Sequence, residues 1–171
     1  MPTDLIHLIG IAAPAETIYE AITTEDGIRA WWTTAVKMDD KAGGQAVFSF
    51  FNFSTAFQMR IEELMVNDQG DTNSPSTILR TPSPPSGEKD GMSGRSIVRW
   101  RCTGGTSPDW VGTTQEFVLT PQPDGEVLLK FTHGGWERGG DHCYFCNTTW
   151  GHLLVCLKDY CERGVKNPYF K

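Results

Sequence analysis

The sequence has 171 residues, 39% of them hydrophobic, and a formal net charge of −6. This length suits one compact domain over residues 1–171, and the acidic balance argues against a nucleic-acid partner, which needs a basic face. The apolar stretch in residues 1–12 is short and is broken by Asp4, His7 and Gly10, so we expect neither a signal peptide nor a membrane span. Five irregularly spaced cysteines fit reduced thiols, and we expect a cytoplasmic protein.

The first part of the chain predicts one strand followed by two short helices. Leu5 to Ile11 is short and rich in branched apolar residues, which is typical of a strand. Pro14 suits the first turn of a helix, and apolar residues at helical spacing predict that helix from Ala15 to Thr23. A second helix is expected from Glu25 to Trp32, where two adjacent tryptophans can wedge the helix pair against a core.

From residue 36 onward the apolar residues alternate, which predicts antiparallel strands. The expected strands are Val36 to Asp39, Gln45 to Phe51, Phe57 to Glu62, Ser96 to Cys102, Thr113 to Thr120 and Glu126 to His133. The pair Gly134-Gly135 is expected to break the last strand. Residues from about 67 to 94 are rich in Ser, Pro and Gly, so we expect a flexible loop or insertion there, with Thr77 to Arg80 as its only strand-like piece.

The segment from His142 to Arg163 predicts the longest helix, because apolar residues recur along it at three- and four-residue steps. The stripe consists of Cys146, Trp150, Leu153, Leu154, Leu157, Tyr160 and Cys161. Gly164 and Pro168 favour an end to the helix. A long amphipathic helix after a series of strands predicts an α+β, helix-grip fold, in which a curved antiparallel sheet of six or seven strands wraps around the helix.

Several segments also resemble a known family. IAAPAETIYEAITTEDGIRAWW, at residues 11–32, resembles the opening of the START-like superfamily, also called SRPBCC. The segments IVRWRC, GTTQEFVLTPQPDGEVLLKFTHGGW and WGHLLVCLKDYCERG resemble the subgroup named after the activator of the heat shock protein 90 ATPase. Together these segments cover nearly the whole chain except residues 67–94.

The resemblance implies a sheet that encloses an apolar pocket for lipids, polyketides or other small ligands. We therefore expect the binding of a small hydrophobic or lipid-like ligand in a cavity between the sheet and the last helix. An enzyme of the cyclase, hydrolase or dehydratase kind, using His133 with Glu116 or Asp141, is an alternative. A third is a co-regulator of a chaperone, although chaperone-activating members also use a separate amino-terminal domain that nothing in this chain resembles. A homodimer is left open.

Alternation in the strands and the helix stripe together define the residues expected to line the cavity. They are Trp32, Phe48, Phe50, Phe57, Met59, Trp100, Phe117, Leu119, Leu129, Phe131, His133, Trp150 and Leu154. The same residues can also form a plain core, but we expect the helix to stand off from the sheet. His133 is expected at the rim, and we favour a structural histidine with satisfied hydrogen bonds over one that orients a ligand or acts as an acid or base.

The run His142-Cys143-x-x-Cys146, followed by His152 and Cys156, contains the residue types that zinc prefers. No second CxxC or HxxxH accompanies it, and His152 and Cys156 are displaced around the helix. We therefore expect reduced, buried cysteines, no metal and no cofactor. No nucleophile elbow or phosphate-binding glycine loop occurs in the sequence, so no catalytic residue is assigned.

Overall fold

The computed structural model describes residues 3–66, 94–137 and 139–171. Seven antiparallel strands form one sheet in the order β1-β7-β6-β5-β4-β3-β2. The strands are β1 (Thr3–Ile11), β2 (Ala35–Met38), β3 (Gln45–Phe50), β4 (Thr55–Met65), β5 (Ser96–Gly105), β6 (Thr114–Pro121) and β7 (Val127–Trp136). The helices are α1 (Ala15–Thr23), α2 (Glu25–Trp31), the short 3-10 helix η1 (Pro108–Trp110) and α3 (Asp141–Arg163).

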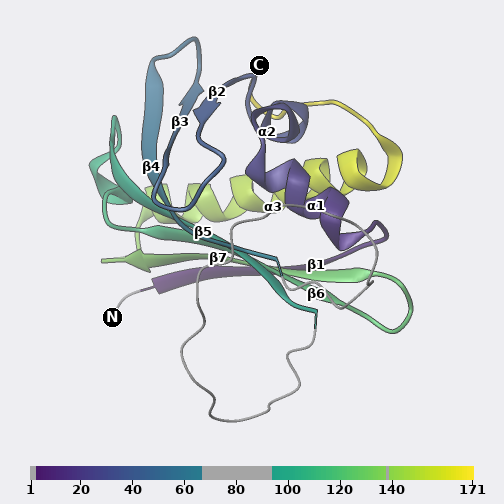
Figure 1. The fold of residues 1–171 in the computed structure, drawn as a ribbon. Helices are drawn as coiled ribbons and strands as arrows, with labels where there is room; N and C mark the ends of the chain where they lie inside the picture. Colours follow the sequence, from purple (N-terminus) through teal and green to yellow (C-terminus); the bar gives the residue numbers. More distant parts are fainter. Residues whose placement is uncertain (1–2, 67–93, 138) are drawn as a thin grey trace.

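The sheet curves around α3, as Figure 1 shows. Strands β2, β3 and β4 rise beside the helix, whereas β1, β5, β6 and β7 run beneath it. Helices α1 and α2 both pack against α3, and α1 also contacts β5 and β6. Register shifts between β4 and β5 mark bulges, which bend a sheet locally. The predicted α+β, helix-grip fold, with its antiparallel sheet and two short helices after the first strand, is confirmed.

A close approach of backbones at the end of β5 requires a glycine. Gly105 has a φ of +141°, and a Cβ atom placed there would lie 2.2 Å from the carbonyl oxygen of Ala56. Strands β4 and β5 can therefore pair to their ends only because residue 105 has no side chain.

Helix α3 buries one stripe against the sheet, as its periodicity predicts. The buried residues are Cys143, Cys146, Trp150, Leu153, Leu154 and Leu157. Gly164 ends the helix in the left-handed conformation, and its amide donates to the carbonyl of Tyr160. Near this end, the Glu162 carboxylate accepts from the Ala12 amide at 2.6 Å, while Lys158 Nζ donates to the Gly10 carbonyl at 2.6 Å. These two bonds tie α3 to the end of β1.

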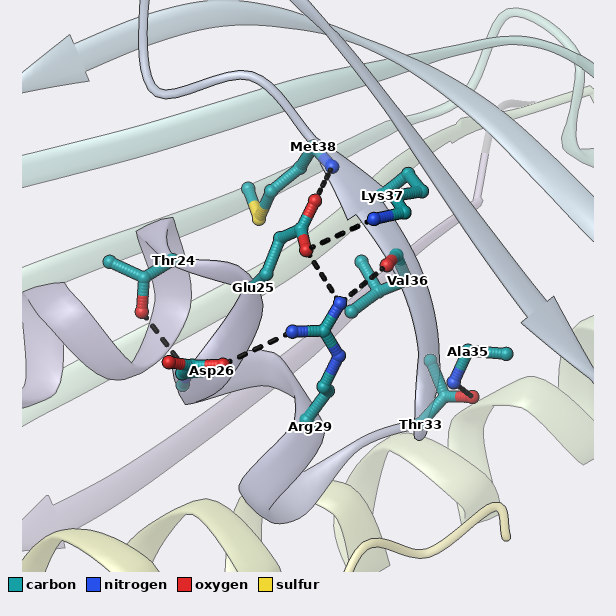
Figure 2. Close-up of polar contacts among 10 residues, drawn as sticks. Thr24, Glu25, Asp26, Arg29, Thr33, Ala35, Val36, Lys37 and Met38 are labelled. Carbon is teal, nitrogen blue, oxygen red and sulfur yellow. Dashed lines mark hydrogen bonds and ion pairs between the residues drawn. The ribbon is translucent and has the colours of Figure 1, made fainter.

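A polar cluster ties α2 to β2 (Figure 2). The Glu25 carboxylate accepts from the Met38 amide at 3.1 Å and from the Arg29 guanidinium, which also donates to the Val36 carbonyl at 3.2 Å. The Met38 and Arg29 donors hold the pKa of Glu25 below its ordinary value. The cluster fixes the chain on both sides of Trp32, whose ring stacks on Phe48 with centroids 4.5 Å apart.

Two expectations about element ends are corrected. Gly134 and Gly135 do not break β7, which continues to Trp136 because the Gly135 amide finds an acceptor in Asp4 Oδ1 at 3.1 Å. The strand expected from Ser96 to Cys102 ends later, since β5 pairs with β4 as far as Gly105. The loop or insertion expected over residues 67–94, with its strand-like piece, lies almost entirely outside the described residues.

Candidate functional site

Aromatic side chains fill the middle of the contact between α3 and the sheet. The rings of Phe131 and Trp150 have centroids 4.1 Å apart, and those of Trp32 and Trp150 lie 5.0 Å apart. Phe117 lies 4.9 Å from Phe131 on the neighbouring strand. The helix therefore contacts the sheet here and does not stand off from it, because two large rings occupy the space between the backbones.

His133 is fully buried in this packed region and is not at a rim. Its Nδ1 accepts from Trp150 Nε1–H at 3.0 Å. The ring proton is thus on Nε2, which donates to the Thr113 hydroxyl at 3.0 Å. Thr113 in turn donates to the Trp110 carbonyl at 2.7 Å. This directed chain of hydrogen bonds joins α3, β7 and η1.

The surroundings of His133 suit a structural histidine. Burial lowers its pKa to about 3, so the ring is neutral near neutral pH, and both nitrogens already have partners. Glu116 lies on the opposite face of β6 from Gln115 and pairs with Arg99, while Asp141 is exposed at the start of α3. The structure therefore does not bring the proposed pair of His133 and Glu116 together.

A cavity of about 300 Å³ lies beside the amino-terminal half of α3. His133 is not part of its lining, although it contacts two lining residues, Trp110 and Trp150. The cavity is enclosed by α3, the ends of β3 and β4, the segment around η1 and the carboxyl-terminal segment. Its lining residues are Trp32, Phe50, Phe51, Thr55, Phe57, Thr106, Ser107, Trp110, His142, Phe145, Cys146, Thr149, Trp150, Leu153 and Phe170. The exposed side chains of Phe51 and Phe145, 61% and 69% accessible, show that this cavity reaches the surface.

Four of the thirteen residues expected to line a cavity do line this one. They are Trp32, Phe50, Phe57 and Trp150. The other nine are buried in the core outside its lining: Phe48, Met59, Trp100, Phe117, Leu119, Leu129, Phe131, His133 and Leu154. The inward face is as the alternation predicts, but the open space lies at one end of that face.

The mouth of the cavity is bordered by a turn with unusual backbone geometry. Phe51, Asn52 and Phe53 have φ values of 50°, 54° and 67°, in the left-handed region that disfavours a bulky side chain. The turn places Phe51 against Phe170, with ring centroids 5.3 Å apart. Strain of this kind gathers at functional positions in proteins.

The polar part of the lining centres on His142. Its Nδ1 lies 3.2 Å from Asp109 Oδ2 and 3.4 Å from the Ser107 hydroxyl. Helix η1 brings Asp109 to this place and also directs Trp110 inward, where its ring stacks on Phe57 at 3.9 Å. The cavity thus has aromatic walls and one imidazole with a fixed partner.

The cysteines of the CxxC step are protonated thiols. Burial raises the pKa of Cys146 to about 11 and also raises that of Cys143. Within the described ranges, no three His, Cys, Asp or Glu side chains gather closely enough to hold a metal ion. Cys146 contributes only a neutral, polarisable wall to the cavity.

Sequence reasoning missed several lining residues for identifiable reasons. Cys146 and Leu153 lie on the predicted stripe but were not assigned to the cavity. His142, Phe145 and Thr149 continue the three- and four-residue steps toward the helix start, so extending the stripe in that direction would have found them. The remaining positions carry no periodic signal, because they lie in a turn, at the first residue of β4, in and just before η1, and in the carboxyl-terminal segment.

Comparisons with known proteins agree with this architecture. The family model described as activator of Hsp90 ATPase homolog 1-like protein matches residues 12–69. The solution structure of the Aha1 dimer from Colwellia psychrerythraea is 27% identical, with a TM-score of 0.69 over 95% of this chain and 98% of that one. The comparison with curated proteins found no match. None of the described helices is long and apolar enough to cross a membrane.

Two further solved structures share the fold at lower identity. DynU16, a protein of the dynemicin biosynthetic locus, is 15% identical with a TM-score of 0.67. The match covers 97% of this chain and 49% of the DynU16 chain. Major latex-like protein 151 from Panax ginseng is 10% identical with a TM-score of 0.58, over 94% and 97% of the two chains.

The curved sheet, the gripped helix and these structural matches define a helix-grip protein that resembles the START-like superfamily. Within the superfamily, the resemblance to the subgroup of activators of the Hsp90 ATPase is confirmed by the family model and the Colwellia structure.

Proposed function

We propose that this protein binds a small hydrophobic or lipid-like molecule in the cavity beside the amino-terminal half of α3. The observation that carries the proposal is an apolar space of about 300 Å³ that opens to the surface between aromatic side chains. Ligand sites in proteins are commonly concave, mainly apolar and supplied with a few placed polar groups. This cavity has each of those properties.

The apolar lining supports a useful affinity. A ligand that buries roughly 200 Å² of apolar surface gains about 5 kcal/mol from the transfer alone, before the costs of immobilisation. Contacts with the rings of Phe57 and Trp110 add to that gain, because aromatic stacking contributes beyond the buried area. We therefore expect dissociation constants of roughly 0.1–1 mM for well-fitting ligands.

A pair of variants on α3 tests the proposal. Thr149 lines the cavity, and Thr149→Phe would fill part of it, whereas the neighbouring Thr148 is exposed and outside the lining. We expect Thr149→Phe to weaken the binding of naphthalene-sized ligands at least tenfold in calorimetric titrations, and Thr148→Phe to leave it unchanged. Equal binding by both variants would place the ligand elsewhere and would contradict the proposal.

The family match favours a second candidate function, the regulation of a chaperone ATPase. The match covers residues 12–69, and the Colwellia relative is described as an Aha1 dimer. Stimulation of a purified Hsp90 ATPase by this protein would support the role, and an unchanged ATPase rate with saturating protein would refute it. Light scattering of the same preparation would show whether the chain forms a homodimer.

A further inference from the structure

We infer that the ligand carries a hydroxyl group, which donates a hydrogen bond to His142. This inference rests on the proposed function, because it assigns the chemistry of the polar end of the same cavity. The ligand class is then a compact apolar alcohol or phenol. A carboxylate or a purely apolar molecule would be held less tightly.

Most polar side chains of the lining already have partners within the protein. The Thr149 hydroxyl donates to the Phe145 carbonyl at 3.0 Å, and the Thr106 hydroxyl accepts from the Ala56 amide at 3.1 Å. Among the described residues of the lining, the Nε2 atom of His142, the Thr55 hydroxyl and the buried Nε1–H of Trp110 have no hydrogen bond. Of these three groups, only His142 is held by a charged partner.

Asp109 determines which hydrogen bond His142 can offer. A carboxylate only accepts, so the Asp109 oxygen at 3.2 Å favours the tautomer with its proton on Nδ1. In that tautomer the Nε2 atom is an acceptor, so a donor on the ligand can bond to it. A hydroxyl group supplies that donor.

Charge around this end of the cavity disfavours an anionic ligand. Asp109 contacts the imidazole directly, and Asp141 adjoins His142 at the exposed start of α3. The chain as a whole carries a formal net charge of −6. A carboxylate entering beside Asp109 would meet repulsion and would also face an acceptor nitrogen.

Titration calorimetry with naphthol, its methyl ether and naphthoate tests this inference, because these probes share one apolar body. We expect naphthol to bind about fivefold more tightly than the ether, the usual effect of one neutral hydrogen bond, and naphthoate to bind most weakly. His142→Phe, which keeps a ring in place, and Asp109→Asn, which removes the charge that orients the imidazole, should reduce the preference for naphthol over the ether. Thr55→Val should keep it, and circular dichroism would show that each variant is folded.

The outcomes separate this inference from the function on which it rests. Equal binding of naphthol and its ether, or tightest binding of naphthoate, would overturn the role of His142 and leave the cavity as a ligand site. A preference for naphthol that survives His142→Phe but disappears in Thr55→Val would assign the hydroxyl to Thr55 instead. Absence of saturable binding for all three probes would refute both proposals.

Discussion

The buried histidine predicts that the protein loses stability in mild acid. His133 is neutral in the folded protein because burial lowers its pKa to about 3, whereas an unfolded chain has an imidazole pKa of about 6.5. Between these two values the unfolded state binds the proton and the folded state does not. Stability is therefore fully present above about pH 6.5 and falls as the pH drops toward 3.

The two pKa values give the size of the effect. Each unit of difference corresponds to about 1.4 kcal/mol, so the whole shift is about 5 kcal/mol, and about 2 kcal/mol of it is lost between pH 7 and pH 5. The interval from pH 7 to pH 5 best isolates the effect of His133. Carboxylates such as Glu25 and Glu162 have lowered pKa values and therefore protonate at more acidic pH.

Urea unfolding at several pH values measures this slope, with His133→Gln as the comparison. Glutamine can accept from Trp150 and donate to Thr113 but does not titrate, so the variant should be less stable at pH 7 yet lose about 2 kcal/mol less by pH 5. His7, whose pKa is also lowered by burial, is present in both proteins and cancels in the difference. Parallel pH dependences for the two proteins would show that the folded state protonates His133 and would refute the reasoning.

Three substitutions test the packing by urea unfolding. Leu157→Ala removes a fully buried side chain and should lower the free energy of unfolding by about 2–5 kcal/mol. Val155→Ala, on the exposed side of α3, should lower it by under about 1 kcal/mol. Similar losses in the two variants would mean that the buried stripe is misplaced. Gly105→Ala should cost more than about 2 kcal/mol, since its Cβ would lie 2.2 Å from the Ala56 carbonyl oxygen, and a neutral effect would contradict the close approach. Phe53→Gly should raise stability by about 1 kcal/mol, because Phe53 is 75% exposed at a φ of 67°, and a loss of stability would show that the strain is absent.

The sequence predicts the fold well because each signal it uses is local. The stripe of α3 and the alternation in β6 and β7 identify which side chains point inward. Those faces follow from the spacing within each element, whichever element packs against it. The predicted end of β7 was wrong because the strand continues through Gly134 and Gly135. The Gly135 amide donates to the carboxylate of Asp4, which is distant in the sequence.

The site was harder to predict because it depends on volumes and on distant segments. Alternation shows that Phe131 and Trp150 face each other, but not that their rings meet and close the space between helix and sheet. The imidazole of the cavity is that of His142, whose partner Asp109 comes from a 3-10 helix. No periodicity in the sequence relates those two residues.

Nuclear magnetic resonance with labelled methyl groups tests the central claim most directly, by locating a bound naphthol through intermolecular nuclear Overhauser effects. Leu153 and Thr149 line the cavity, whereas Leu119 and Leu129 lie in the core outside its lining. We predict contacts from the ligand to the methyl groups of Leu153 and Thr149 and none to those of Leu119 and Leu129. Contacts to Leu119 and Leu129 alone, or an absence of any intermolecular contact at saturating ligand, would contradict a binding site beside the amino-terminal half of α3.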